Sequence, residues 1–281
     1  MTQIFVVGYP KSGNTWLTRM IAKATSIPVR ALNSAHSEIA ADVNKEIGSE
    51  GAMDAGGVFK LHDMPEDFES RLAQQADGEK AKIVYIFRDI EDTFVSSFFY
   101  FRRNAIKSNI SKPDIEQYVE KGGGLKRVLN PTWLIRHIYW RLKLNQYLRS
   151  FIRYGYSKDA VTYADHLSSW FEYLKKNKDR FEFAVTRYED LMNNPVPEMS
   201  KICTRLGYDN LSSEAIEAIV RSESFSNRKK AIENSSDQLT LGKEFNKKFL
   251  RSGKVGDSKR FLTNNQVARL QGTLKNLASR P

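Results

Sequence analysis

The chain has 281 residues, 41% of them hydrophobic, and its 44 Lys and Arg against 33 Asp and Glu give a net charge of +11. A single cysteine excludes an intramolecular disulfide, and no stretch approaches the roughly 20 apolar residues of a membrane span. No secretory signal, linker or repeat is visible, so we expect one domain over residues 1–281 in a cytoplasmic protein. The excess of basic over acidic residues favours polyanionic partners. The basic residues are scattered along the chain, however, and do not specifically indicate a nucleic-acid-binding face.

Residues 3–16 combine a short apolar strand, a glycine-bounded turn and the start of a helix. The backbone N–H groups of such a turn, closed by the positive end of a helix, form an anion-binding site. The spacing almost matches the ATP-binding loop G-x-x-x-x-G-K-[ST], with Gly8, Gly13 and Thr15 in place. Position 14 is asparagine, however, and the lysine lies inside the loop as Lys11. The loop therefore predicts a phosphate-bearing ligand other than an ordinary Mg-ATP complex.

Strands and helices alternate along the rest of the chain. Apolar runs predict strands at 3–8, 57–62, 82–87 and 181–188, and helical spacing predicts helices after Trp16, after Asp89 and at about 132–152, 163–177, 196–206 and 212–221. The segment 102–130 contains a glycine triplet and is expected to be a mobile excursion, and the stretch 226–260 is polar and basic. The alternation predicts an α/β fold of three layers, P-loop-like, with a mainly parallel central sheet flanked by helices.

Polar side chains end the predicted strands, where parallel sheets bind their ligands. They are Lys11, Lys60 with His62, Arg88 and Tyr188. Alternation along a strand places residues 60 and 62 on the same side. A lone histidine at a strand end is more often structural, but the neighbouring lysine makes His62 a candidate general base for an acceptor hydroxyl, with Lys60 beside the transferring group. The other histidines, His36, His137 and His166, are expected to be surface or packing residues.

Four separated segments make the chain resemble a sulfotransferase that uses 3′-phosphoadenosine 5′-phosphosulfate (PAPS), particularly the cytosolic type. They are residues 9–16, 60–62, 88–96 and 251–257, and a similar helix and strand followed by Tyr-Glu-Asp-Leu lie between His166 and Leu191. The resemblance covers essentially the whole chain. It implies transfer of a sulfonate from PAPS to a hydroxyl of a small-molecule acceptor, without a metal, which leaves 3′-phosphoadenosine 5′-phosphate (PAP).

The resemblance also implies roles for individual residues. It places Lys11 at the oxygen that bridges phosphorus and sulfur, and Trp16 against the adenine. The loop residues that would hold the 5′-phosphosulfate are Lys11, Ser12, Gly13, Asn14, Thr15 and Trp16. The 3′-phosphate would be held by Arg88 and Ser96 and covered by the loop with Arg251, Ser252 and Gly253. The positions that match the lining of the adenine are Tyr188, Ser224 and Phe225.

Three positions depart from the family pattern. Asn14 stands where the family usually has threonine, Ser258 where it usually has tryptophan, and Arg228 where an apolar residue is expected. Structural alternatives also remain for the phosphate ligands. Arg88 could form a salt bridge with Asp89 or Asp92, and the 251–253 segment could be part of a solvated basic tail.

The acceptor cannot be predicted from this sequence. The aromatic residues at 98–101 could line an acceptor pocket, although half of them could equally be helix core, and 102–130 could form a lid. A P-loop kinase or NTPase is the alternative enzyme, disfavoured by Asn14 and by the Lys-x-His spacing. The charge of +11 suggests a non-catalytic binder of nucleotide or nucleic acid as a further alternative. Nothing in the sequence predicts the oligomeric state.

Overall fold

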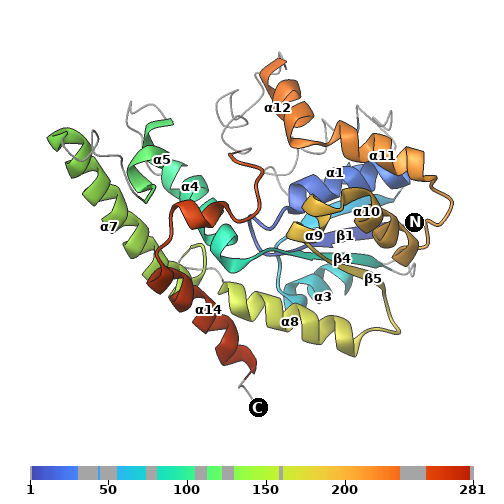
Figure 1. Cartoon of the computed structure of the whole chain (residues 1–281). Helices are drawn as coiled ribbons and strands as arrows, with labels where there is room; N and C mark the ends of the chain where they lie inside the picture. Colours follow the sequence, from blue (N-terminus) through green and yellow to red (C-terminus); the bar gives the residue numbers. More distant parts are fainter. Residues whose placement is uncertain are drawn as a thin grey trace. The chain divides into compact units, whose positions relative to one another are not determined.

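The computed structural model describes residues 2–30, 44, 56–73, 81–104, 113–121, 130–157, 161–234 and 251–278. Its contacts group into two compact units, whose elements are drawn in Figure 1. The first unit is formed by residues 1–88 and 166–250, and the second by residues 89–165 and 251–281.

A parallel sheet of five strands is the centre of the first unit (Figure 1). The strands are β1 (Gln3–Val7), β2 (Val29–Arg30), β3 (Gly57–Leu61), β4 (Lys82–Phe87) and β5 (Glu182–Arg187), in the order β2-β3-β1-β4-β5. Four of them are the strands that the apolar runs predict, whereas the two-residue β2 is too short to show any periodicity. Val7 is in register with Leu61 and with Tyr85. The loops after β1 and β3 therefore leave the sheet at the same edge.

Helices cover both faces of this sheet, so the predicted three-layer α/β fold is confirmed. The helices α1 (Asn14–Thr25), α10 (Pro195–Arg205) and α11 (Ser213–Ser222) pack on one face, against a core that includes Val6 and Val84. On the other face, Phe5 and Tyr85 pack against α3 (Pro65–Ala73) and α8 (Tyr163–Lys176). Because both faces are covered, the strands are apolar at nearly every position rather than alternating.

The second unit is helical. It contains α4 (Ile90–Asn104), α5 (Pro113–Val119), α7 (Pro131–Tyr154), the short 3₁₀ helix η1 (Asp257–Arg260) and α14 (Asn264–Ala278). Phe98 lies against Tyr147 of α7, with ring centroids 5.8 Å apart, and Phe99 lies 5.1 Å from Phe261. Both phenylalanines are buried, so this half of the 98–101 aromatic cluster is helix core.

Several helices lie where the sequence analysis predicted none. Part of the 102–130 excursion is helical, because α4 continues to Asn104 and α5 follows, while the glycine triplet lies outside the described residues. The polar stretch 226–260 contains most of α12 (Phe225–Asn234). Tyr188 begins a short helix, α9 (Tyr188–Asn193), directly after β5. Apolar periodicity misses such elements because their faces are short or mostly polar.

Capping residues carry the signal for two of the missed helices. At the start of α14, the Thr263 N–H donates to Gln266 Oε1 at 2.8 Å and the Gln266 N–H donates to Thr263 Oγ1 at 3.4 Å, which is a capping box. In α3, Pro65 occupies the start and acidic residues fill the first turn. Caps of this kind are visible in the sequence, and they would have predicted both helices.

Candidate active site

The loop between β1 and α1 is bent by two residues in the left-handed backbone region. The φ angles are 75° at Lys11 and 103° at Gly13. A Cβ at Gly13 would lie 2.6 Å from Cδ2 of Tyr188, so this position requires glycine. The N–H of Leu17 donates to the Gly13 carbonyl at 3.1 Å and starts the hydrogen-bonded turns of α1. The N–H groups just before it lie at the positive end of the helix, where an anion can accept from them.

Two polar side chains at this edge of the sheet lack partners among the described residues. Ser12 is fully buried, and its Oγ makes no hydrogen bond within that part of the chain. Lys60 makes no ion pair there either, and burial lowers the pKa of Lys60 to about 8. A buried hydroxyl without a partner is costly unless a ligand satisfies it. These residues therefore fit an anionic group such as a phosphosulfate.

Asn14 joins the ends of two neighbouring strands. It is buried, and its Nδ2 donates to the carbonyls of Gly8 and Leu61 at 2.9 and 3.1 Å. Because both partners can only accept, the amide nitrogen must face them. The Nδ2 group is thus occupied by the backbone, whereas the buried Oδ1 has no hydrogen-bond partner among the described residues. A contact between Asn14 and a nucleotide stays a prediction.

His62 lies directly after β3, and its Nδ1 is 2.7 Å from the same Gly8 carbonyl. The carbonyl can only accept, so Nδ1 carries the hydrogen and the lone pair of the neutral ring is on Nε2. A backbone contact in the loop therefore sets both the orientation and the tautomer of this imidazole. In that state Nε2 can accept a proton.

Tyr188 contacts two other predicted site residues, Arg88 and Trp16. The guanidinium carbon of Arg88 lies 4.3 Å from the centre of the tyrosine ring, and the Trp16 ring meets it edge-on with centroids 6.0 Å apart. Arg88 Nη1 is also 3.5 Å from the Lys11 carbonyl. The loop, the end of β4 and the start of α9 therefore meet around one aromatic ring. Binding of a 3′-phosphate by Arg88 stays a prediction.

Glu223 is a buried residue that the sequence analysis missed, and it holds Trp16 in place. The indole Nε1 donates to the Glu223 backbone carbonyl at 2.9 Å. The Glu223 carboxylate accepts two bonds from Arg19, at 2.8 and 3.1 Å, and lies 2.6 Å from Lys23 Nζ. Arg228, one of the departures from the family pattern, lies 3.7 Å from the same carboxylate. The acid is about 200 residues away from Arg19 and Lys23, so no local pattern could reveal this cluster.

Replacing Glu223 by glutamine is expected to destabilise the protein. The substitution leaves Arg19, whose side chain is only 4% exposed, without its buried counter-charge, at a cost of about 3–5 kcal/mol in the free energy of unfolding. Urea unfolding measures this cost. Glu217→Gln is the matched control, because it removes an exposed pair with Arg221 and should cost less than about 0.5 kcal/mol. Equal effects of the two substitutions would contradict the structural role of Glu223.

Ser224 and Phe225, two predicted adenine contacts, follow Glu223 at the start of α12. The Ser224 Oγ accepts from the Asn227 N–H at 3.4 Å and so caps this helix. They directly follow Glu223, whose backbone carbonyl accepts the hydrogen bond from the Trp16 indole. Their contact with an adenine stays a prediction.

The loop before η1 is anchored by Asp92 of α4, another residue that the sequence analysis did not single out. The N–H groups of Gly256 and Ser258 donate to the Asp92 carboxylate at 2.7 and 2.9 Å. Ser258, which replaces the family tryptophan, is buried at this contact. Arg251 lies 2.6 Å from Asp257 and packs over the Phe99 ring. The roles of Ser96, Arg251, Ser252 and Gly253 at a 3′-phosphate stay predictions.

Of the two roles expected for His166, surface or packing, the structure shows packing. His166 is buried, and its Nδ1 lies 3.1 Å from the Tyr85 hydroxyl. Burial lowers the pKa of His166 to about 4, although the nearby backbone of His62 and Asp63 favours the protonated form. The ring is therefore neutral near pH 7. His137 stacks on Trp133, with centroids 4.7 Å apart, and His36 lies outside the described residues.

The buried His166 is expected to make the fold sensitive to acid. The unfolded chain binds a proton near pH 6.5 and the folded chain only near pH 4, so the folded state loses stability as the pH falls through this window. The expected loss is about 2 kcal/mol between pH 8 and pH 5. Urea unfolding at both pH values should show a smaller loss for His166→Phe than for the unmodified protein. His137→Phe should keep the full loss, and an unchanged slope in His166→Phe would refute the assignment.

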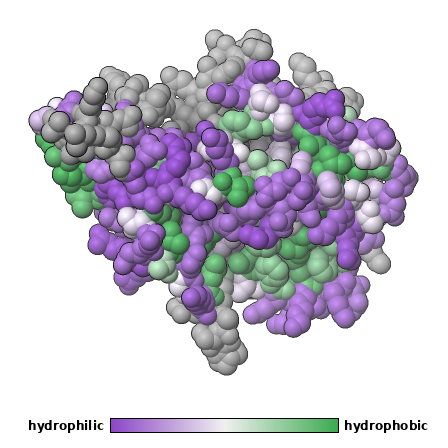
Figure 2. Space-filling view, viewed as in Figure 1, coloured by the Kyte–Doolittle hydropathy of each residue, from purple (hydrophilic) through white to green (hydrophobic). Residues whose placement is uncertain are grey.

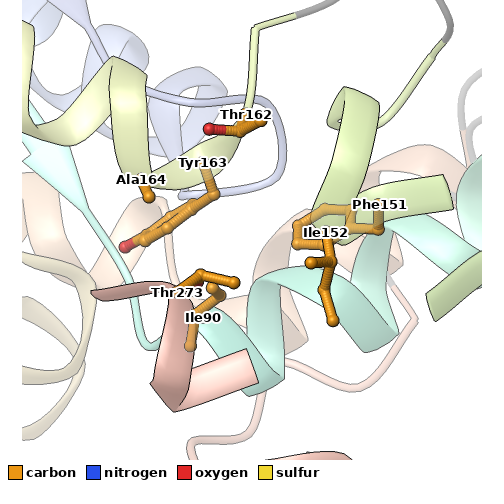
Figure 3. A pocket seen from close by; sticks show the side chains of 7 residues that line it. All are labelled: Ile90, Phe151, Ile152, Thr162, Tyr163, Ala164 and Thr273. Carbon is orange, nitrogen blue, oxygen red and sulfur yellow. The ribbon is translucent and has the colours of Figure 1, made fainter. Parts of the chain in front are cut away.

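A small pocket lies within the second unit (Figure 3). Its lining comes from the end of α7, the start of α8, and one residue each of α4 and α14: Ile90, Phe151, Ile152, Thr162, Tyr163, Ala164 and Thr273. No charged side chain lines it, and its volume of about 10 Å³ suits a single water molecule. It is therefore not the anion site.

Within the part of the chain that the structure describes, no group of three or more His, Cys, Asp or Glu could hold a metal ion. No helix in those residues is long and apolar enough to cross a membrane.

Comparison with known proteins identifies the family. The sequence model of the sulfotransferase domain matches residues 1–280, so the chain belongs to the sulfotransferase family. Cytosolic sulfotransferase 17 of Arabidopsis thaliana is 25% identical over 96% of this chain and 72% of its own length. The fold resembles that of mouse sulfotransferase SULT7A1 complexed with PAP, with a TM-score of 0.65 and 22% identity over 100% of this chain and 86% of the mouse chain. It also resembles retinol dehydratase in complex with androsterone and inactive cofactor PAP, with a TM-score of 0.60 and 15% identity over 99% and 80% of the two chains.

Proposed function

We propose that this sulfotransferase moves a sulfonate group from PAPS to a hydroxyl of a small-molecule acceptor, and that residues 1–281 form one domain for this reaction. The observation that carries the proposal is the pairing of an anion cradle with an oriented base. The cradle contains the buried Ser12 hydroxyl and the start of α1, and the Gly8 carbonyl that borders it fixes the tautomer of His62. Family membership and the PAP in a structural neighbour support the choice of donor.

The donor would bind along the carboxyl edge of the sheet. When bound, PAPS supplies an activated sulfonate whose bond to the phosphate oxygen is weak enough to break during transfer. The loop from Lys11 to Trp16 would hold the 5′ end through its N–H groups and the hydroxyls of Ser12 and Thr15. Trp16, held by Glu223, would present one ring face to the adenine. Arg88 and Ser96, with the 251–253 segment, would hold the 3′-phosphate.

In this proposal His62 removes the proton of the attacking hydroxyl. Nε2 accepts that proton while the acceptor oxygen bonds to sulfur and the bond from sulfur to the nucleotide oxygen breaks, which leaves PAP. The Lys11 ammonium stabilises the negative charge that grows on the departing oxygen, and the Lys60 ammonium stabilises the sulfonate oxygens. Atoms and electrons balance without any change of oxidation state, and the two lysines supply the positive charge that a metal supplies in phosphoryl transfer.

The acceptor would be a small molecule with a hydroxyl group. The androsterone bound to retinol dehydratase is an alcohol, which supports this class without identifying the compound. Tyr100 and Phe101, half-buried at the end of α4, and the 102–130 segment with α5 are the parts proposed to contact it.

Ligand-induced stabilisation and a transfer assay test the proposal together. PAP without metal is expected to raise the melting temperature more than Mg-ATP does, because the loop has Asn14 where an ATP site has lysine. Labelled PAPS is then incubated with a panel of phenols, steroids, saccharides and amines, and sulfonation of at least one hydroxyl compound is expected. Stabilisation by Mg-ATP alone would instead support a kinase or NTPase. Salt-sensitive binding of oligonucleotides without any sulfonation would support a nucleic-acid-binding protein.

A further inference from the structure

The longest helix of the second unit, α7, exposes apolar side chains that cover nothing in the described structure. One side of this helix is core, with Trp140, Leu144 and Phe151 buried. The opposite side has apolar residues at positions 134, 135, 138, 139 and 142, which share a helical face. Their exposed fractions are 37% for Leu134, 68% for Ile135, 51% for Ile138, 51% for Tyr139 and 62% for Leu142. Figure 2 shows apolar atoms where Figure 1 draws this helix.

All charged residues of this helix are basic. Its 24 residues include five Lys or Arg and no Asp or Glu. Arg149 and Arg153 are exposed and continue the apolar face toward the C-terminal end of the helix, with Lys143 at its margin. Lys143 and Arg153 lie over the rings of Tyr139 and Tyr154, at 5.5 and 5.1 Å, instead of pairing with a carboxylate in the described residues. We call the exposed apolar residues and these three cations the α7 face.

From this combination we infer that the α7 face binds the surface of an anionic lipid bilayer. An apolar stripe next to cations is the pattern of helices that lie in the membrane interface, where the apolar side chains enter the acyl boundary and the cations meet acidic head groups. The long Lys and Arg side chains can reach the head groups while their stems stay in the apolar layer. No part of this inference requires the helix to cross the bilayer.

A second copy of the chain fits the α7 face less well than lipid does. A symmetric pair would place α7 against the α7 of its partner, because a twofold axis joins the same patch of each subunit. The cations of both helices would then share one interface, and neither helix has a carboxylate to offset them. Nucleic acid would match the cations but would leave the exposed isoleucines and leucines in contact with water or phosphate.

Vesicle flotation with the full chain tests the inference. The protein is expected to float with vesicles of phosphatidylcholine and phosphatidylglycerol at low salt, to float much less with phosphatidylcholine alone, and to be released by high salt. Replacing Arg149 and Arg153 together by glutamine should lower the partition coefficient about 30-fold. Each lost positive charge lowers this coefficient roughly fivefold, and the two factors multiply. Replacing Ile135, Ile138 and Leu142 together by glutamine should abolish flotation.

Matched variants separate this surface from the overall charge of the protein. Glutamine is a good helix former, and the replaced side chains are exposed, so both variants should keep the melting temperature of the unmodified protein. Lys175→Gln with Lys176→Gln on α8 removes two exposed charges elsewhere and should leave flotation nearly unchanged. Equal loss in this control would overturn the assignment to α7, and so would absence of flotation in the unmodified protein. A dimer that the triple glutamine variant turns into a monomer, without vesicle binding, would assign the face to self-association instead. Flotation requires neither PAPS nor an acceptor, so its outcome is independent of the proposed transfer reaction.

Discussion

His62→Ala is expected to lower kcat for sulfonation by roughly 10²–10⁴-fold, while the dissociation constant of PAP stays within about twofold. The substitution removes Nε2, the atom proposed to take the proton of the acceptor hydroxyl. The contacts proposed for the nucleotide come from the loop, from Arg88 and from Trp16, and they do not involve the imidazole. Steady-state kinetics with labelled PAPS and calorimetric titration with PAP measure the two effects separately.

Two further variants make this result interpretable. His62→Asn keeps a donor in the side chain but has no atom basic enough to accept the proton, so it should be nearly as inactive as His62→Ala. His137→Ala removes a histidine of α7 that stacks on Trp133 and should leave kcat unchanged. Near-normal turnover in His62→Asn would contradict the assignment of His62 as the base.

Lys60→Met is the second substitution with a large expected effect, a fall in kcat of roughly 10²–10³-fold. Lys60 lies on β3 two residues before His62, and it makes no ion pair within the described residues. Its charge is therefore available to stabilise the sulfonate as the bonds to sulfur change. Methionine keeps the apolar stem of the side chain and removes only the ammonium group. A variant that loses PAP affinity but keeps kcat would show that Lys60 acts in binding alone.

The lowered pKa of Lys60 also predicts a pH dependence. Burial lowers this pKa to about 8, and the charged form exists below that value, so kcat/KM for PAPS should fall as the pH rises through about 8. A bound anion favours the ammonium form, so the corresponding fall in kcat should occur at higher pH. Lys60→Arg keeps its charge at all accessible pH values and should lose this limb of the kcat/KM profile. Persistence of the limb in Lys60→Arg would assign it to another group.

The parts of the fold that follow from local patterns were predictable. Four strands are buried on both faces and therefore appear as continuous apolar runs, and parallel pairing then places their carboxyl ends at one edge. The helices with a wide apolar stripe were predicted for the same reason. The helices α3, α5, α12 and α14 were missed because they are short, polar or defined mainly by their caps.

The candidate site also has parts that were predictable from local patterns and parts that were not. The sequence by itself determined the turn between β1 and α1, because its glycines, its inner lysine and the helix that follows lie within one short segment whose spacing sets the turn. It also predicted that Lys60 and His62 share one side of a strand, but β3 ends at Leu61 and His62 follows it, so this arrangement stays a prediction. Only the tertiary structure decided the tautomer of His62 and the position of Asn14, since both depend on the Gly8 carbonyl, which the His62 ring meets across 54 positions of the chain. Only the tertiary structure showed that Glu223 accepts hydrogen bonds from both Trp16 and Arg19. Spacing fixes which groups a short segment presents, whereas hydrogen bonds between distant segments fix how those groups point, and a single sequence carries no local signal for such bonds.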